Sequence, residues 1–266
     1  MVNWFGCFTE VEVFWLLWGA LVALCWGSFL NVVAFRLVFE TPFFRKRSHC
    51  PHCDKQLGWY ELLPIISWFF LRGRCGSCKA TISWLYPLIE FLTMVSFLGL
   101  WCVVPGPFFP AYALFFSALL ITIRTDIEAL LIFRYFTVAL IPIGWFCAWM
   151  GYLPISLFMS VVATGSGYAL LAAVRGIFFW ATGRVGMGQG DLELLAMIGA
   201  FTGVIGVWVA LFSASIVGSV IGLILMVMRR ADKQTPIPFG AFLSLGALFA
   251  VFLSCYHSLD FLFFII

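Results

Sequence analysis

Charged residues are scarce in this chain. Lys, Arg, Asp and Glu together make up 10% of its 266 residues, whereas hydrophobic residues make up 64%. A typical soluble domain is only about half apolar, so this composition excludes a soluble globular protein. The net charge is only +3. Because the basic residues follow the membrane topology described below, we do not expect nucleic-acid binding.

Polar interruptions are also few. Apolar runs of about 20 residues, the length of a helix that crosses a bilayer, recur along the whole chain. The runs are continuous and do not alternate with polar residues, which argues against a β-barrel. We therefore predict an all-α polytopic membrane protein with about eight transmembrane helices. The expected spans are 12–38, 84–104, 108–124, 134–151, 155–180, 191–204, 206–228 and 238–262.

The sixth and seventh spans allow two interpretations. The sixth span is short, and a tight turn near Gly203 and Gly206 follows it. A single hairpin that does not fully cross the membrane is the alternative for this pair. The two interpretations differ in whether the chain between 191 and 228 crosses the bilayer twice.

Basic residues are missing from every second connection between the predicted spans. None lies near 105–107, 151–154 or 203–206, or at either terminus. All 15 lie in the remaining connections or the adjoining span ends: Arg36, Arg45, Lys46, Arg47, Lys55, Arg72, Arg74, Lys79, Arg124, Arg134, Arg175, Arg184, Arg229, Arg230 and Lys233. Because loops rich in Lys and Arg stay in the cytoplasm, we expect these connections to be cytoplasmic and both termini to lie outside.

The N-terminus has no basic segment before its first apolar run and carries Glu10 and Glu12 instead. A cleavable signal peptide begins with positive charge, so we expect the first span to be a retained anchor. The sequence shows no convincing internal repeat and no low-complexity linker. The expected organisation is a first membrane span over 1–38, a cytoplasmic insert over 39–83 and a membrane domain over 84–266.

Two Cys-x-x-Cys pairs lie in the cytoplasmic insert, Cys50 with Cys53 and Cys75 with Cys78. Pairs at this separation are typical of a tetrahedral four-thiolate zinc site, and disulfides are disfavoured in the reducing cytoplasm. A closed shell of four thiolates indicates a structural zinc. Such a metal stabilises an insert of about 45 residues, which is too small to bury a sufficient core. The alternatives are two disulfides or four free thiols.

The remaining cysteines and histidines show no ligand pattern. His49 and His52 lie beside the first Cys pair, and we expect them to be surface residues or to support the site without binding the metal. We expect the other five cysteines, which lie in or near apolar spans, to be packing residues: Cys7, Cys25, Cys102, Cys147 and Cys255.

Acidic residues are few at the cytoplasmic membrane boundary. Asp126 lies at the end of the third span, and Glu128 follows it by two residues. Asp191 lies at the start of the sixth span, and Glu193 follows it by two residues. Glu90 lies about two turns into the second span. A carboxylate at such a boundary is unfavourable unless it is solvated, paired or functional. We therefore expect Asp126 and Asp191 on the same membrane face.

Asp191 ends the segment Gly188-Gln189-Gly190-Asp191, whose glycines allow a sharp turn and a close approach to another segment. Two aspartates that meet share one proton, because like charges so close cannot both ionise easily. One carboxyl then activates water as a base, while the other polarises the peptide carbonyl and protonates the leaving amine. The alternatives for such acids are interfacial solvation, salt bridges to Arg124 or Arg184, and helix capping, which Asp191 could provide.

Taken together, these residues resemble the type IV prepilin leader peptidases, which are bacterial aspartic proteases of the membrane. The resemblance covers nearly the whole chain. The Gly-x-Gly-Asp segment alone would be a weak signal, but the set of motifs in this order is highly specific. The matching segments are Gly27–Val33 with Arg36-Leu37, Cys50–Cys53, Trp59-Tyr60-Glu61 with Pro64, Leu71–Cys75 with Cys78-Lys79, Tyr86-Pro87 with Glu90, Gly186–Asp191 with Gly199-Ala200 and Gly203, and Pro236–Gly240.

The resemblance implies that Asp126 and Asp191 are the catalytic pair. It also implies removal of a short basic leader from prepilin or pseudopilin precursors of type IV pili and type II secretion. The reaction would take place at the cytoplasmic face of the bacterial inner membrane, so the implied partners are these precursors and the lipid bilayer. The residues implied to support the pair are Gly188, Gly190, Glu128 and Glu193.

A second activity is also implied. Many members of the family methylate the new N-terminal residue with S-adenosylmethionine, and this activity is associated with the cytoplasmic loop. In this chain, Glu61 and Gly73 match loop positions that the family links with methylation. Methyltransferase activity, with S-adenosylmethionine as its cofactor, is therefore an expectation beside peptidase activity.

The chain departs from the family pattern at several positions. Arg134 stands where the aspartate of a leucine-proline-aspartate motif is expected, and Glu193 stands where a lysine is usual. Glu193 adds a third carboxylate beside Asp191, which Arg134 is a candidate to offset. Glu128 replaces a common aspartate and keeps its charge. In the insert, the departures count against methylation more than against proteolysis: Leu62 replaces a usual asparagine, and Trp84-Leu85 replace a basic pair.

Two functions without proteolysis are the alternatives. A zinc-containing membrane scaffold or assembly protein would explain the cysteines equally well, but it has no need for two boundary aspartates. An ion-coupled transporter would use the same acids, but its charges are expected nearer the middle of the membrane, on interrupted helices.

Overall fold

Helices make up the regular secondary structure of this protein, apart from two isolated β-bridges in the part of the chain described. The structure is a computed structural model that describes residues 10–40, 48–184, 186–228 and 237–256. The all-α class expected from the sequence is confirmed. The elements are α1 (Glu10–Val38), η1 (Trp59–Leu62), α2 (Ile66–Phe70), α3 (Leu85–Val103), η2 (Gly106–Phe108), α4 (Phe109–Ala129), α5 (Arg134–Trp149), α6 (Leu157–Thr182), α7 (Gln189–Val227) and α8 (Phe239–Tyr256).

Five helical segments are long and apolar enough to cross a membrane, which confirms a multi-pass membrane protein. The prediction of eight transmembrane helices goes further than this, because two of the predicted spans lie in the one helix α7, α5 has 16 residues and α8 is among the shorter apolar helices. The five candidate spans are Val13–Val38, Leu85–Val103, Gly106–Ala129, Leu157–Thr182 and Gln189–Val227.

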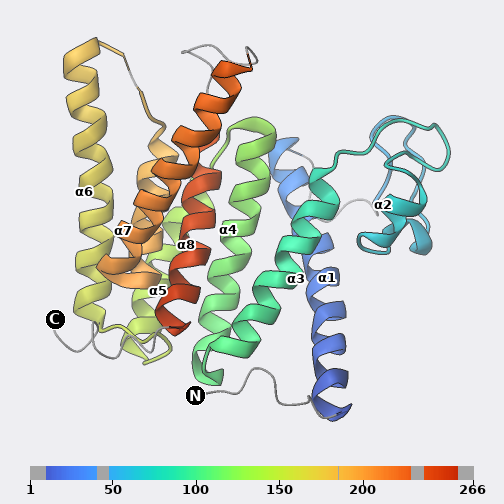
Figure 1. The fold of residues 1–266 in the computed structure, drawn as a ribbon, viewed down its shortest axis with the longest axis horizontal. Helices are drawn as coiled ribbons and strands as arrows, with labels where there is room; N and C mark the ends of the chain where they lie inside the picture. Colours follow the sequence, from blue (N-terminus) through green and yellow to red (C-terminus); the bar gives the residue numbers. More distant parts are fainter. Residues whose placement is uncertain (1–9, 41–47, 185, 229–236, 257–266) are drawn as a thin grey trace.

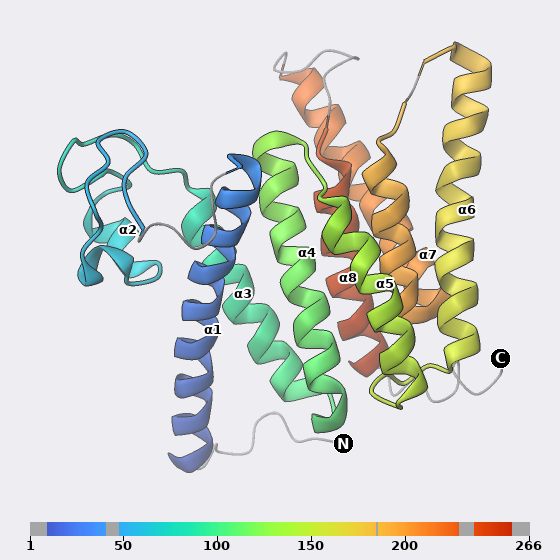
Figure 2. The ribbon, with the colours of Figure 1, turned by 180° about the vertical axis from the view of Figure 1, so that it is seen from behind.

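The predicted sixth and seventh spans both lie within α7. This helix has 39 residues but is interrupted at Gly203, where φ is 71° and ψ is −174°. Glycine is the residue that adopts this backbone conformation without strain. The chain runs down the bundle to this point and then back up, so the two parts of α7 lie antiparallel (Figures 1 and 2). The tight turn expected near Gly203 is therefore present.

The helices α4 and α7 form the middle of the bundle. α4 contacts α1, α3, α5 and α8, while α7 contacts α5, α6 and α8. Phe115 of α4 stacks on Phe201 of α7 with ring centroids 4.7 Å apart, and both rings are fully buried. The outer helices α1 and α6 expose many large apolar side chains. Lipid can cover such a surface, whereas water cannot do so favourably.

One end of the bundle gathers the ends of α1, α4 and α6 and the starts of α3, α5 and α8 (Figures 1 and 2). The start of α1 and the end of α8 lie at the opposite end. The insert, residues 48–84, lies beside the end of the bundle at which α1 ends and α3 begins (Figures 1 and 2). This arrangement agrees with the alternation of basic connections in the sequence. The termini 1–9 and 257–266 lie outside the described residues, as do six of the basic residues: Arg45, Lys46, Arg47, Arg229, Arg230 and Lys233.

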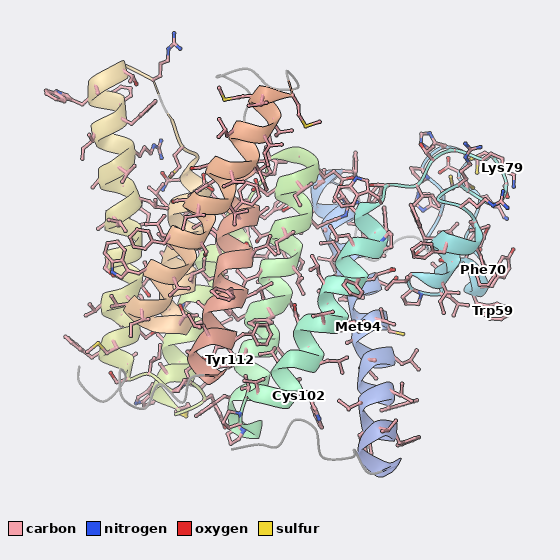
Figure 3. All side chains as sticks on the ribbon, viewed as in Figure 1. Trp59, Phe70, Lys79, Met94, Cys102 and Tyr112 are labelled. Atoms are coloured by element: carbon pink, nitrogen blue, oxygen red, sulfur yellow. The ribbon has the colours of Figure 1, made fainter. Side chains whose placement is uncertain are left out.

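The insert has an aromatic edge and a charged edge. Trp59 and Phe70 are exposed at one edge, near α2, and Lys79 lies at the opposite edge (Figure 3). Within residues 48–84, the buried side chains are limited to Cys50, Glu61 and Cys75. The insert therefore has no apolar core of its own apart from the two buried cysteines.

Candidate active site

Asp126 lies in the last turn of α4 and is 4% exposed. Its Oδ2 atom accepts a hydrogen bond of 2.8 Å from the backbone N–H of Ala241, and the backbone N–H of Gly240 also donates to this carboxyl. Both donors belong to the first turn of α8, where free N–H groups and the helix dipole favour a negative charge. The start of α8 therefore binds and orients the Asp126 side chain.

Asp191 lies in the first turn of α7 and is 9% exposed. Gly188 is the N-cap residue, so Asp191 is the third residue of the helix, and its carboxyl accepts a hydrogen bond from the backbone N–H of Gly188. This contact is one half of a capping box. The capping role considered from the sequence is therefore present, and it fixes the Asp191 side chain at the helix start.

The two carboxyls are close enough to interact electrostatically. Ile132, which lies between α4 and α5, packs against two glycines. One is Gly190, which precedes Asp191 in the sequence, and the other is Gly240, whose N–H donates to Asp126. A Cβ atom on Gly190 would lie 2.7 Å from the Cβ of Ile132, and a Cβ on Gly240 would lie 2.5 Å from its Cδ1. Non-bonded carbons do not come this close, so a side chain at 190 would collide with the rigid Cβ of Ile132, and one at 240 would displace the tip of the Ile132 side chain. The two glycines therefore let the starts of α7 and α8 pack closely against Ile132.

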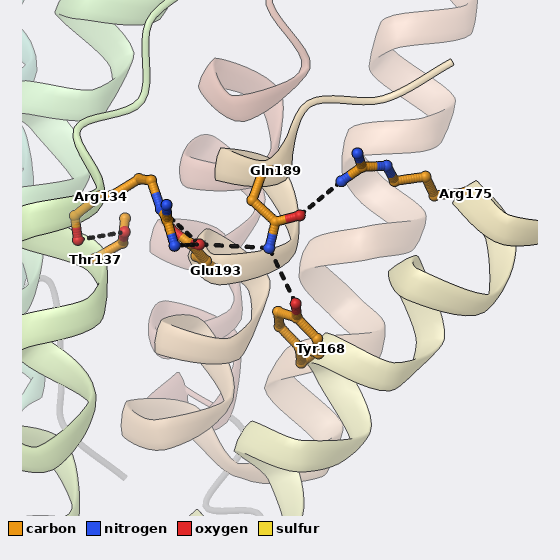
Figure 4. Close-up of polar contacts among 6 residues, drawn as sticks. All are labelled: Arg134, Thr137, Tyr168, Arg175, Gln189 and Glu193. Carbon is orange, nitrogen blue, oxygen red and sulfur yellow. Dashed lines mark hydrogen bonds and ion pairs between the residues drawn. The ribbon is translucent and has the colours of Figure 1, made fainter. Parts of the chain in front are cut away.

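Glu193 is buried but does not lack a partner. The Nε atom of Arg134 lies 2.8 and 3.0 Å from the two carboxylate oxygens of Glu193, and its Nη2 lies 2.7 Å from Oε1 (Figure 4). The side-chain amide of Gln189 donates to Glu193 at 3.4 Å and to the hydroxyl of Tyr168 at 3.0 Å, while its carbonyl accepts from Arg175 at 2.6 Å. The two positions with unexpected charges in the sequence, 134 and 193, thus neutralise each other.

Arg124 is fully buried in α4, and its ion pair is with Glu128, one turn later, at 2.5 Å. Its Nε donates to the side-chain carbonyl of Asn31 at 3.3 Å, and its guanidinium lies over the ring of Tyr86, 4.9 Å from the centroid. These contacts join α4 to α1 and α3. Arg124, which the sequence suggested as a salt-bridge partner for the boundary acids, therefore forms its salt bridge with Glu128.

The four cysteines of the insert lie on two knuckles with the same backbone pattern. In each knuckle the first cysteine, Cys50 or Cys75, donates its N–H to the carbonyl five residues later and accepts from the N–H four residues later. An isolated β-bridge closes each knuckle, between His49 and Gln56 and between Arg74 and Thr81. The spacing of the cysteines therefore produces two equivalent turns that present their sulfurs to one point.

The sulfur atoms of Cys50, Cys53, Cys75 and Cys78 all lie within 4.8 Å of one another, and all four cysteines are free of disulfides. The Cys50 and Cys78 sulfurs are 3.8 Å apart. Zinc–sulfur bonds of about 2.3 Å in a tetrahedron separate sulfurs by about 3.8 Å, so the cluster fits a four-thiolate zinc. The backbone N–H groups of Cys78 and Ser77 also donate to the sulfur of Cys75, and such donors favour the thiolate form that zinc binds.

The other candidate ligands lie apart from this cluster. His49 lies 3.8 Å from Asp54, and His52 is exposed; neither belongs to the group of sulfurs. The remaining cysteines were expected to be packing residues, and two of them lie on the outer surface of candidate membrane spans. Cys147 is half-buried, but Cys25 and Cys102 are exposed on α1 and α3, as Figure 3 shows for Cys102. The side chains of Cys7 and Cys255 lie outside the described residues.

Glu61 and Gly73 both have structural roles in the insert. Glu61 is buried, accepts a hydrogen bond from the N–H of Gly58 at 2.9 Å and lies 3.6 Å from the ammonium of Lys55. Gly73 has a φ of 66°, and a Cβ there would lie 2.9 Å from the ring of Trp68. Their link with methylation stays a prediction.

A cavity of about 330 Å³ lies between the insert and the helices α1, α3 and α4. Small-molecule sites commonly have volumes of this order. Three carboxylates line it, those of Glu61, Glu90 and Glu128, together with the aromatic rings of Trp68 and Tyr86. Arg36 also lines the cavity, Arg124 pairs with Glu128 and covers the ring of Tyr86, and Lys55 lies beside Glu61. Glu90, which accepts a hydrogen bond from the N–H of Ile65, and the ring of Trp68 are the remaining groups that would attract a positive charge.

Three features of the site could not be found from the sequence. The first is the pair of α8 N–H groups on Asp126, although the Pro236–Gly240 segment did mark the lead-in to that helix; Pro236 itself lies outside the described residues. The second is the contact between Arg134 and Glu193: the sequence made Arg134 a candidate to offset Glu193, but the contact itself depends on how α5 approaches α7. The third is the cavity, because its walls come from four separate segments.

Two protein-family models match the chain. Residues 21–104 match the bacterial peptidase A24 N-terminal domain, and residues 113–227 match the type IV leader peptidase family. Together the matches cover α1, the insert and the helices that carry Asp126 and Asp191. No solved structure matches the chain significantly.

Several curated proteins are similar to the chain over most of their length. A prepilin leader peptidase/N-methyltransferase of Stutzerimonas stutzeri is 34% identical over 83% of this chain and 84% of that protein. One of Dichelobacter nodosus is 35% identical over 85% and 87%. A type 4 prepilin-like proteins leader peptide-processing enzyme of Escherichia coli O78:H11 is 31% identical over 85% and 90%. The chain therefore belongs to the type IV leader peptidase family of A24 peptidases.

Proposed function

We propose that this chain is an aspartic endopeptidase of the bacterial inner membrane, which removes the leader of prepilin or pseudopilin precursors at the cytoplasmic face. Asp126 and Asp191 are its catalytic pair. The observation that carries the proposal is that these two buried carboxyls, at the end of α4 and the start of α7, lie near enough for their charges to interact. Membership of the leader peptidase family supports it, as do the names of the relatives, which refer to prepilins or prepilin-like proteins.

The reaction uses the two carboxyls as one unit. Two neighbouring carboxyls do not both ionise easily, so one stays protonated while the other acts as base and removes a proton from the attacking water. The protonated one polarises the scissile carbonyl and then gives its proton to the leaving amine. The N–H groups of Gly240 and Ala241 hold the Asp126 carboxyl in place, and the N–H of Gly188 holds that of Asp191.

The substrate class fits the position of the pair. A prepilin-like precursor has an apolar helix that can lie in the bilayer and a basic leader that stays at the cytoplasmic face. Its scissile bond then lies at the level of the membrane boundary, where Asp126 ends α4 and Asp191 begins α7. The basic connections at this end of the bundle support the assignment of this end to the cytoplasm.

The direct test replaces each aspartate by the nearly isosteric asparagine. Asp126→Asn and Asp191→Asn should each abolish leader removal from a co-expressed prepilin, while the protein still inserts in the membrane. Asp54→Asn is the matched control, since this side chain is 85% exposed on the insert, and it should process normally. Normal processing by either catalytic-site variant would refute the assignment.

We also propose that zinc on Cys50, Cys53, Cys75 and Cys78 is structural. The converging sulfurs of the two knuckles support this. A shell closed by four thiolates leaves no position for a substrate, so the metal supplies folding energy only. Metal analysis of the purified protein tests it, and absence of zinc beside four titratable thiols would contradict it.

The cavity beside the insert is the proposed site of methyl transfer. S-adenosylmethionine carries a sulfonium and an ammonium charge, and the carboxylate of Glu90 suits such a cation, since those of Glu61 and Glu128 already face Lys55 and Arg124. The ring of Trp68 adds cation–π attraction. When bound, this cofactor supplies the methyl group for the new N-terminus. Mass spectrometry of the processed substrate decides, because a missing 14-Da shift means that the activity is lost.

We propose that the chain crosses the membrane eight times, with both termini outside. The antiparallel parts of α7 and the shorter helices α5 and α8 then count as crossings. Alkaline phosphatase, which is active only outside the cytoplasm, should be active when fused after residue 152 and inactive after residue 184. An active fusion after residue 184 would overturn this topology.

A further inference from the structure

We propose that Arg134 and Glu193 form a positioning pair, which clamps the first turns of α7 to the start of α5 and so holds Asp191 against Asp126. The inference rests on the proposed function, since it takes the two aspartates as the catalytic groups. Neither Arg134 nor Glu193 takes part in a chemical step of the proposed reaction.

The geometry of the pair favours a fixed orientation. Arg134 is the first residue of α5, and its guanidinium contacts both oxygens of the Glu193 carboxylate at 2.7 to 3.0 Å. A guanidinium that binds both oxygens of a carboxylate sets the angle between the groups as well as their distance. The Glu193 side chain is only 6% exposed, whereas that of Arg134 is 66% exposed. The pair therefore joins an arginine at the surface to a buried glutamate.

Glu193 and Asp191 leave α7 on different sides. They are two residues apart, and successive residues of an α-helix are about 100° apart around its axis, so their side chains point about 160° apart. Asp191 faces the end of α4, and Glu193 faces α5. Rotation of α7 about its axis would carry Asp191 away from Asp126, and the same rotation would break the contacts of Glu193 with Arg134.

A second set of contacts holds the same turn from α6. Gln189, the first residue of α7, accepts a hydrogen bond from Arg175 at 2.6 Å and donates to Tyr168 at 3.0 Å (Figure 4). It also donates to Glu193 at 3.4 Å. The start of α7 is therefore fixed by α5 and α6 together, and Arg134 is the member of this network that contributes a charge to balance Glu193.

Burial makes the pair sensitive to the loss of one partner. An exposed ion pair contributes little, but a buried carboxylate that loses its cation is left without compensation. Here that carboxylate belongs to the same helical turn as Asp191. Reversal of both charges, in contrast, keeps the contact and its neutrality.

The experiment is a charge-reversal cycle on the full-length enzyme with Arg134→Asp, Glu193→Lys and the double variant, measured on a prepilin. Each single reversal should lower kcat by about tenfold to a hundredfold, the loss that follows from small misplacement of reacting groups. KM should stay nearly unchanged, because the pair does not touch the substrate. The double variant should recover most of the lost kcat. Arg184→Asp reverses an exposed charge between α6 and α7 and should leave kcat unchanged.

The outcomes separate this inference from the proposed function. Single variants with normal kcat, or a double variant no better than the singles, would overturn the positioning pair while Asp191→Asn stays inactive. A prepilin cut normally by Asp191→Asn would instead overturn the proposed function. If the single reversals do not accumulate in the membrane, Arg134→Lys keeps the charge but loses the two-oxygen contact. Its kcat should then fall at a normal amount of protein, and an unchanged kcat would refute the inference.

Discussion

At the scale of the residue, Ile132 determines how closely the catalytic helices approach. Its side chain fills the space beside Gly190 at the start of α7 and beside Gly240 at the start of α8. The two contacts differ in kind. A Cβ at position 190 would meet the Cβ of Ile132, which is rigid, whereas a Cβ at position 240 would meet its Cδ1, the tip of the side chain, and would lie 3.1 Å from Asp126.

Alanine at either glycine should therefore impair the enzyme, but in distinguishable ways. Gly190→Ala and Gly240→Ala should each lower stability by about 1–3 kcal/mol, the usual effect of overpacking, and should reduce leader cleavage. A second change, Ile132→Ala, should recover part of the stability of Gly240→Ala but not that of Gly190→Ala. Thermal unfolding in detergent measures the difference.

The control for these variants is Gly165→Ala, because a Cβ at this position of α6 meets nothing within 4 Å. It should leave both stability and cleavage close to those of the unaltered protein. Equal rescue of both alanine variants by Ile132→Ala would contradict the assigned contacts.

At the scale of the element, the insert depends on its two knuckles. Between residues 48 and 84 the buried side chains are two cysteines and Glu61, so no apolar core stabilises the segment. The backbone turns bring the four sulfurs together, and the metal that they fit would supply the missing stability. The insert also forms one wall of the cavity proposed for methyl transfer.

Cys75→Ser should release the zinc and leave the insert open to proteolysis, while the helical bundle stays intact. The reason is that three thiolates cannot close the coordination shell, and the insert has little else to hold it. Metal analysis combined with limited proteolysis checks both parts. Cys102→Ser, on the exposed face of α3, is the control and should keep its zinc; full zinc content in Cys75→Ser would contradict the site.

At the scale of the whole molecule, the sequence predicted the features that depend on composition and spacing. Continuous apolar runs predicted the all-α membrane fold. The alternation of basic connections predicted which helix ends lie on the same side as the insert. The glycine at 203 marked the turn within α7, and the two Cys-x-x-Cys pairs marked the sulfur cluster. Each of these signals is local in the chain, which is why it could be read from one sequence.

The features that were missed depend on contacts between distant helices. Nothing near Asp126 in the sequence indicates that N–H groups of Gly240 and Ala241 will reach it, because that contact follows from how α8 packs on α4. The pairing of Arg134 with Glu193 likewise depends on the approach of α5 to α7. The count of eight crossings was not established either, since α5 and α8 are short for membrane spans.

The central claim is that Asp126 and Asp191 act as one catalytic unit, and one measurement tests it most directly. Leader cleavage by Asp126→Asn, Asp191→Asn and the double variant should be compared at equal amounts of membrane-inserted enzyme. Residues that act as a unit are not additive, so all three variants should show the same background rate. Near-normal cleavage by either single variant, or a double variant far slower than both singles, would contradict the account.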